Sequence, residues 1–172
     1  YALGYVDGLA REYGVEREEL RAYAQANCRG LHGIARAFEV FEHMDGRSDN
    51  GGESEARAAM ILAGVAAPEL QVEITRPGNA GYYLADYGWQ MSNGSWMLAE
   101  LHGLGKFEDD AQNDPEHTAA KTYRAALMRD ANLRAMGHNV IHFKLSDTYD
   151  VKAFGSMMRG YGIPTAKPYV DS

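Results

Sequence analysis

The stretch YYLADYGWQMSNGSWMLAEL, residues 82–101, decides the fold of this chain. It holds two segments rich in aromatic and aliphatic residues, 82–90 and 96–101, which is typical of β-strands. Between them, Ser92-Asn93-Gly94-Ser95 is a hairpin signal, because Asn and Gly tolerate the positive φ that a tight turn requires. The stretch therefore predicts two antiparallel strands joined by a hairpin.

Further elements are predicted on both sides of this hairpin. Residues 70–75 alternate between apolar and polar side chains, and residues 139–143 form a short apolar run, so both are predicted strands. Helical spacing is found over residues 53–64, 115–136 and 149–159. The longest of these helices has a proline in its first turn and a glycine just after its end. This order of helices and strands predicts an α/β fold.

The first fifty residues are predicted to be helical throughout. Segments around residues 5–13, 15–28 and 31–44 carry apolar side chains at helical spacing. The run Asp45-Gly46-Arg47-Ser48-Asp49-Asn50-Gly51-Gly52 is the clearest break in the sequence. We therefore expect a helical subdomain over residues 1–50, an α/β domain over residues 51–160 and a tail over residues 161–172.

Composition limits the classes of function. The chain has 172 residues, a mass of 19.0 kDa, 24% charged and 45% hydrophobic residues, which are ordinary globular values. A net charge of −7 argues against a general binder of polyanions, but it leaves room for a local nucleic-acid site that recruits a divalent metal. No segment is long and apolar enough to predict a membrane span, and no signal segment opens the chain.

Cysteine content and the first residue bear on where the protein works. Cys28 is the single cysteine, so no internal disulfide is possible, and we expect a cytoplasmic location. The chain starts at Tyr1 and not at a methionine, which fits a start within a longer protein.

Three polar side chains on the predicted strands could carry chemistry. Glu100 and His102 are two residues apart on one strand, so they share a face, and Asp86 lies on the preceding strand. A hairpin loop of odd length, such as residues 92–94, places Asp86 directly opposite Glu100. A two-residue loop places the two carboxylates on opposite faces and removes the site.

Two converging carboxylates suit a hard divalent cation. Mg²⁺ prefers oxygen ligands, keeps several waters and commonly bridges to phosphate groups. It can activate a water and stabilise charge on a phosphodiester oxygen, and a neighbouring lysine or histidine can position that water or take its proton. The structural alternative is that Asp86 and Glu100 are solvated or paired acids near strand ends.

Five motifs, in order, resemble the Vsr-like branch of the PD-(D/E)XK restriction-endonuclease superfamily. The resemblance covers roughly residues 50–147. The motifs are GESEAR at 52–57, LQV at 70–72, DYGW at 86–89, AELHGLGKF at 99–107, and RDANL at 129–133 followed by MGHNVIHF at 136–143. The resemblance implies a restriction-endonuclease-like mixed sheet flanked by helices. A domain of this kind also closes many actinobacterial proteins that resemble the AbiEi antitoxins of type IV toxin–antitoxin systems, where it follows a helical segment.

The resemblance also implies a set of site residues. Asp86 and Glu100 would bind the metal, with the Leu101 carbonyl as a further ligand, and Glu55 would be a helix carboxylate beside the site. His102 stands where the fold normally has a lysine, and Lys106 would be a substitute from the following loop.

Each of these candidates also has a plain structural explanation. Glu55 lies near the start of a predicted helix, where acids favour the macrodipole. Lys106 is explained as a solvated loop charge and His102 as a polar residue near the sheet edge. His138 and His142 flank a predicted strand without metal-ligand spacing, so we expect structural roles for both.

The sequence therefore supports three hypotheses. The first is a DNA endonuclease that depends on Mg²⁺ or Mn²⁺ and hydrolyses phosphodiester bonds. The second is a catalytically inactive nuclease-like module of an AbiEi-like antitoxin or transcriptional regulator, which acts by binding a protein partner or DNA. The third is a degenerate structural domain. Asp86 and Glu100 favour the first hypothesis, whereas the missing lysine and the acidic residues 108–116 favour the second.

Overall fold

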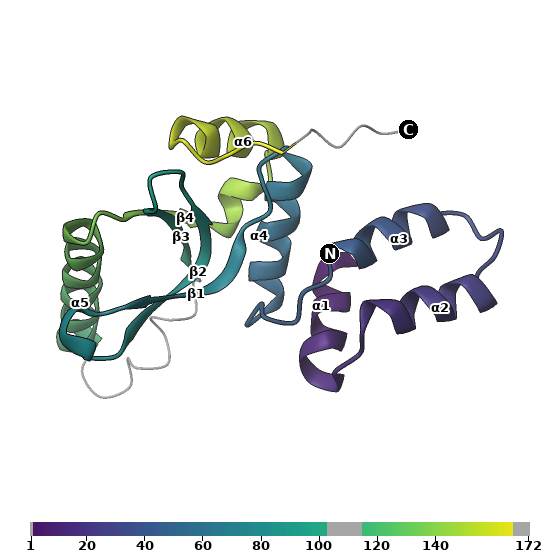
Figure 1. The fold of residues 1–172 in the computed structure, drawn as a ribbon, viewed down its shortest axis with the longest axis horizontal. Coiled ribbons are helices and arrows are strands. Elements are labelled where there is room, and N and C mark those ends of the chain that lie inside the picture. The colour runs from purple at the N-terminus through teal and green to yellow at the C-terminus, as the bar shows by residue number, and fades with distance from the viewer. Residues whose placement is uncertain (1, 103–114, 167–172) are drawn as a thin grey trace. The chain divides into compact units, whose positions relative to one another are not determined.

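The computed structural model describes residues 2–102 and 115–166. The chain divides into two compact units, Tyr1–Ala58 and Ala59–Ser172, each with its own internal packing (Figure 1). The division falls inside helix α4, Gly51–Leu62, whereas the sequence placed its boundary near residue 50. The domain assignment itself stays a prediction.

The first unit is helical, in agreement with the sequence. It contains α1 (Ala2–Tyr13), α2 (Arg17–Asn27), α3 (Ile34–Glu42) and the first two turns of α4. Glu19 stabilises the start of α2, because its carboxylate accepts a hydrogen bond from the Glu16 backbone N–H at 2.9 Å. Side chains of α2 and α3 pair across the unit, as in the ion pair between Arg17 and Glu42.

A buried ion pair holds the first unit together. Arg57 Nη2 on α4 contacts both carboxylate oxygens of Asp7 on α1, at 2.8 and 2.7 Å. Arg57 Nη1 donates to the His43 carbonyl at 2.7 Å, and the Asp45 N–H donates to Asp7 Oδ1 at 2.8 Å. The pair therefore ties α1, α4 and the segment after α3 into one hydrogen-bonded network. Sequence reasoning did not find it, because its members lie 50 residues apart.

Protonation of His43 is expected to destabilise the first unit. Burial and the nearby charge of Arg57 hold the pKa of His43 below its ordinary value of 6.5. The folded state therefore favours the neutral ring, and this contribution to stability is present above the unfolded pKa and is lost as pH falls through the folded pKa. We expect the free energy of unfolding to decline less between about pH 7.5 and about pH 5 in His43→Gln than in the wild type. Urea unfolding at several pH values measures this, and an identical decline in both proteins would contradict it.

The second unit contains a four-stranded mixed sheet. Its strands are β1 (Glu69–Thr75), β2 (Tyr82–Gln90), β3 (Trp96–His102) and β4 (Asn139–Lys144), in the order β1-β2-β3-β4. The first three strands are antiparallel neighbours, and β4 runs parallel to β3. Its helices are α5 (Pro115–Ala135), α6 (Val151–Gly160) and the last turn of α4, with short 3-10 turns at Pro77–Asn79 and Leu145–Thr148. The predicted α/β fold with a mixed sheet flanked by helices is confirmed.

The hairpin between β2 and β3 has the odd loop that the site requires. Met91 and Ser95 close it with a backbone hydrogen bond of 2.8 Å, and Gly94 turns the chain with a φ of +81°. Gln90 then pairs with Trp96, and the register continues to Tyr87 opposite Ala99. Side chains of the two strands are therefore kept in the alignment that puts Asp86 level with Glu100.

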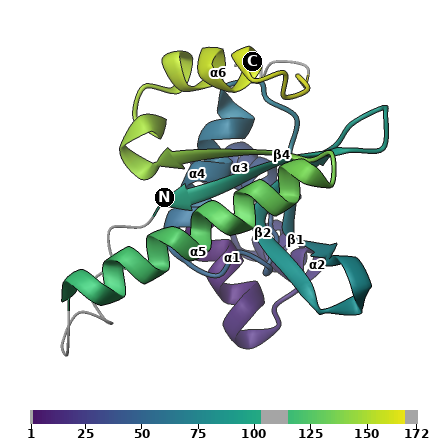
Figure 2. The same ribbon diagram turned by 90° about the vertical axis from the view of Figure 1, so that its left-hand side faces the viewer.

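Apolar side chains cover both faces of the sheet. On one face, Leu133 of α5 packs with Leu98 and Val140 in a buried cluster. On the other, the ring of Phe143 lies 5.3 Å from that of Phe154 on α6. Figure 2 shows α5 lying across the strands. The parallel β3–α5–β4 connection needs such a crossover helix, which is why α5 separates two neighbouring strands.

Within the described ranges, no helix combines the length and apolar character needed to cross a lipid bilayer.

Candidate functional site

The candidate site lies where the pairing of β2 and β3 stops. The paired register ends at Tyr87 opposite Ala99, and Asp86 is the next residue of β2. Asp86 Oδ2 accepts a hydrogen bond of 2.9 Å from the backbone N–H of Leu101 on β3. A side chain thus binds a strand N–H beyond the last register pair, so the two strands hold a carboxylate at this end of their ladder.

Glu100 lies beside Asp86 and is engaged by an arginine from α5. Only 15% of its side chain is exposed, and its Oε1 lies 2.5 Å from Arg129 Nη2. Burial raises the pKa of Glu100, and the charge of Asp86 acts in the same direction. The hydrogen bond from Arg129 opposes this rise without reversing it. Asp86 and Glu100 therefore lie at the same end of the β2–β3 ladder, and their role as metal ligands stays a prediction.

Two histidines stack next to Glu100. The parallel register places His142 of β4 opposite Glu100, and Lys144 opposite His102. The rings of His102 and His142 lie 4.7 Å apart with an interplanar angle of 16°. Burial and the charge of His142 lower the pKa of His102 from its ordinary value. An imidazole pair therefore occupies the strand face on which the sequence predicted His102 alone.

His142 has a further partner on the helix. Its Nε2 lies 2.7 Å from Oδ2 of Asp130, which is itself largely buried. A carboxylate in this position fixes the orientation of the ring and favours one tautomer. The structure thus adds His142, Asp130 and Arg129 to the predicted set. The sequence motif at 129–133 includes Arg129 and Asp130 but assigned neither a role at the site, and only the parallel pairing of β3 with β4 shows why His142 lies with them.

A strained residue adjoins Asp86 on the neighbouring strand. Gln71 has a φ of +52°, and it is the only non-glycine residue of the described chain with a positive φ. It lies between Leu70 and Val72, which pair with Tyr87 and Ala85 on either side of Asp86. Backbone strain of this kind costs energy and tends to be found at functional sites.

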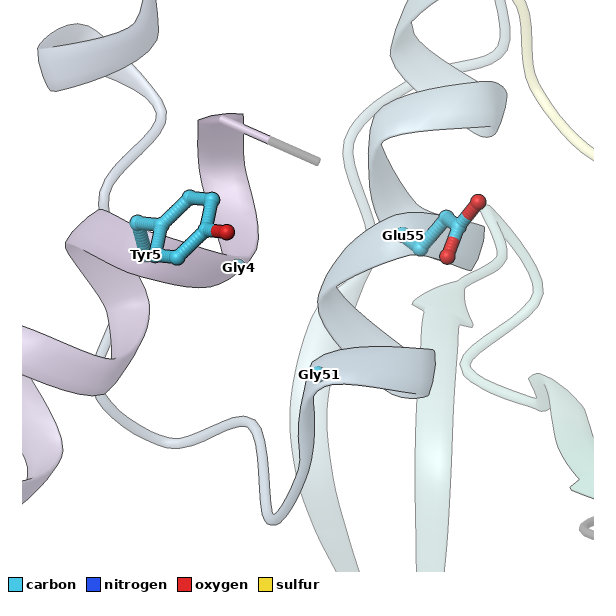
Figure 3. A pocket seen from close by; sticks show the side chains of 4 residues that line it. All are labelled: Gly4, Tyr5, Gly51 and Glu55. Carbon is cyan, nitrogen blue, oxygen red and sulfur yellow. The ribbon is translucent and has the colours of Figure 1, made fainter.

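The structure does not test the roles of Glu55 and Lys106 at this cluster. Glu55 belongs to the first unit, where it lines a pocket of about 300 Å³ with Gly4, Tyr5 and Gly51 (Figure 3). Lys106 lies outside the described residues, as does the acidic segment 108–114. The roles that the resemblance implies for Glu55 and Lys106 therefore stay predictions.

The donor set decides which metal the cluster could hold. Among residues 2–102 and 115–166, no three His, Cys, Asp or Glu side chains are grouped so that they could bind a metal ion. This argues against a closed protein cage such as a structural zinc site. Mg²⁺, however, is commonly held by one or two carboxylates together with waters and substrate phosphates. Asp86 and Glu100 supply the oxygen ligands that such a partly hydrated ion takes.

Comparison with known proteins gives relatives but no family. Two uncharacterized proteins from two strains of Mycobacterium tuberculosis are each 38% identical to this chain over 88 residues. The match covers 51% of this chain and 32% of each relative, so the chain spans about a third of their length. No family model and no solved structure matches the chain.

Proposed function

We propose that the second unit is a phosphodiesterase that cleaves DNA with the help of Mg²⁺ or Mn²⁺. The observation that carries the proposal is the meeting of Asp86 and Glu100 at the end of the β2–β3 ladder, supported by the order of the five sequence motifs. A bound Mg²⁺ would act as a Lewis acid on the phosphodiester and lower the pKa of an attacking water.

The side chains have distinct tasks in this proposal. Asp86 and Glu100 provide the oxygen ligands, and the Leu101 N–H keeps Asp86 in a fixed orientation. In hydrolysis, the oxygen of water bonds to phosphorus, one P–O ester bond breaks, the proton of the water passes to a base, and the leaving oxygen is protonated. In this proposal His102 accepts the proton from the attacking water. The ring of His142 is stacked against that of His102. A supporting role for Glu55 and Lys106 is implied by the resemblance alone.

The test is a cleavage assay on the purified chain. Supercoiled and single-stranded DNA are incubated with the protein in Mg²⁺, in Mn²⁺ and without metal. We expect cleavage that requires the metal and stops when a chelator is added, because the bound metal would activate the attacking water. Absence of cleavage with every metal and substrate would contradict the proposal.

A second candidate function is favoured by the residue at position 102. The family that the chain resembles normally has a lysine where this chain has His102, and a histidine does not keep a constant positive charge. A nuclease-like module of this composition could bind DNA or a protein partner without cleaving DNA, as in an AbiEi-like antitoxin. DNA binding in a gel-shift experiment, together with no cleavage in the assay above, would support this function over the first.

A further inference from the structure

Arg129 binds the carboxylate of Glu100, which is one of the two proposed metal ligands. One nitrogen, Nη2, contacts both Glu100 Oε1 at 2.5 Å and the backbone carbonyl of Leu84. The contact joins α5 to β3 and to β2. It is shielded from water, because 23% of the Arg129 side chain and 15% of the Glu100 side chain are exposed.

The charges explain why this contact forms. Asp86 and Glu100 place two negative charges at the end of one ladder, and burial makes their repulsion costly. The guanidinium compensates one of these charges with a short, charge-assisted hydrogen bond. Asp130, the next residue of α5, is turned to His142 instead, so it does not neutralise Arg129. Arg129 is therefore placed to stabilise the pair of carboxylates in the state without metal.

A divalent cation and Arg129 compete for the same oxygen. A carboxylate oxygen that accepts a short hydrogen bond from a guanidinium is a poor ligand, and a second cation nearby repels the metal. We propose that Arg129 is an internal cation that holds Glu100 until a divalent metal displaces it, and that it thereby sets the metal affinity of the site. This inference rests on the proposed function, because it assigns the regulation of the same metal site.

The location of Arg129 makes displacement feasible. Its second acceptor is the Leu84 carbonyl, so a shift of Nη2 toward that carbonyl would leave the guanidinium one hydrogen bond when Glu100 is released. Its helix is anchored further along by Leu133, which is fully buried, so the backbone need not move. A rotation of the side chain is then sufficient to open the carboxylate.

The experiment is a titration with Mn²⁺, followed by electron paramagnetic resonance and by calorimetry. Arg129→Ala is expected to bind Mn²⁺ about tenfold more tightly than the wild type, which corresponds to about 1.4 kcal/mol. Arg134→Ala is the matched control, because Arg134 lies exposed in the last turn of the same helix. We expect the affinity of this control to equal that of the wild type.

A double-mutant cycle tests whether the gain in Mn²⁺ affinity depends on the Glu100 carboxylate. In a Glu100→Gln background, the Arg129→Ala substitution is expected to give no increase in Mn²⁺ affinity, because the contested oxygen is no longer a carboxylate. Arg129→Gln serves as a second variant should Arg129→Ala unfold, which circular dichroism reveals.

The outcomes separate this inference from the proposed function. Wild type that binds Mn²⁺ while Arg129→Ala binds it equally or more weakly would overturn the displacement and leave the metal site standing. A gain that persists in the Glu100→Gln background would also overturn it, since a general charge effect would then be the cause. Absence of Mn²⁺ binding by both the wild type and Arg129→Ala would overturn the metal site and the inference together.

Discussion

Replacement of Asp7 by alanine is expected to destabilise the first unit by about 3–5 kcal/mol. The carboxylate of Asp7 is fully buried, and its partner Arg57 is 5% exposed. Alanine would leave the guanidinium buried without its counter-ion, and it would also remove the acceptor of the Asp45 N–H. The loss of a partner from a buried pair is costly because the remaining charge keeps its desolvation penalty.

Urea unfolding followed by circular dichroism measures this effect. Glu12→Ala is the matched control, because Glu12 lies on the same helix in an ion pair with Arg11 that is largely exposed. Exposed pairs contribute about 0–1 kcal/mol, so the control should unfold close to the wild-type midpoint. The double variant Asp7→Leu with Arg57→Met should regain part of the lost stability, because no charge is then left buried, while the Asp45 N–H and the His43 carbonyl still lose their partners. Equal midpoints for Asp7→Ala and Glu12→Ala would show that the buried pair contributes nothing.

The strands and the hairpin between them were predictable because their signals are local. Residues 82–101 carry the strand composition and the turn residues within one short stretch. The sequence left an odd loop and a two-residue loop open, and the pairing of Gln90 with Trp96 shows that the loop is odd. A hairpin is fixed by its turn, so a correct turn gives the correct facing of every side chain on both strands. The α/β order of elements followed from similarly local signals.

The partners of the site were not predictable in the same way. Arg129 lies 29 residues from Glu100, and Asp130 lies 12 residues from His142. Their contacts depend on how α5 crosses the sheet and on the parallel pairing of β4 with β3, which no short pattern encodes. His142 was assigned a structural role for this reason, whereas the structure stacks it on His102 beside Glu100.

The Glu100→Gln variant is expected to cleave DNA about a thousandfold more slowly than the wild type. Glutamine keeps the shape of the side chain, but it removes the negative charge that a divalent cation requires. Metal ions contribute several kcal/mol to the stabilisation of the transition state, and about 4 kcal/mol corresponds to this loss in rate. Single-turnover cleavage in saturating Mg²⁺ measures the change.

Glu73→Gln is the control for this prediction. Glu73 is an exposed acid on β1 of the same sheet, where it pairs with Leu84 in the register and makes no part of the proposed site. Both substitutions remove one negative charge and leave the side-chain volume unchanged, so a difference between them isolates the position of the carboxylate. Equal rates for the two variants would exclude Glu100 as a metal ligand. A rate for Glu100→Gln that recovers in high Mn²⁺ would show instead that Asp86 still recruits the ion and that Glu100 governs its affinity.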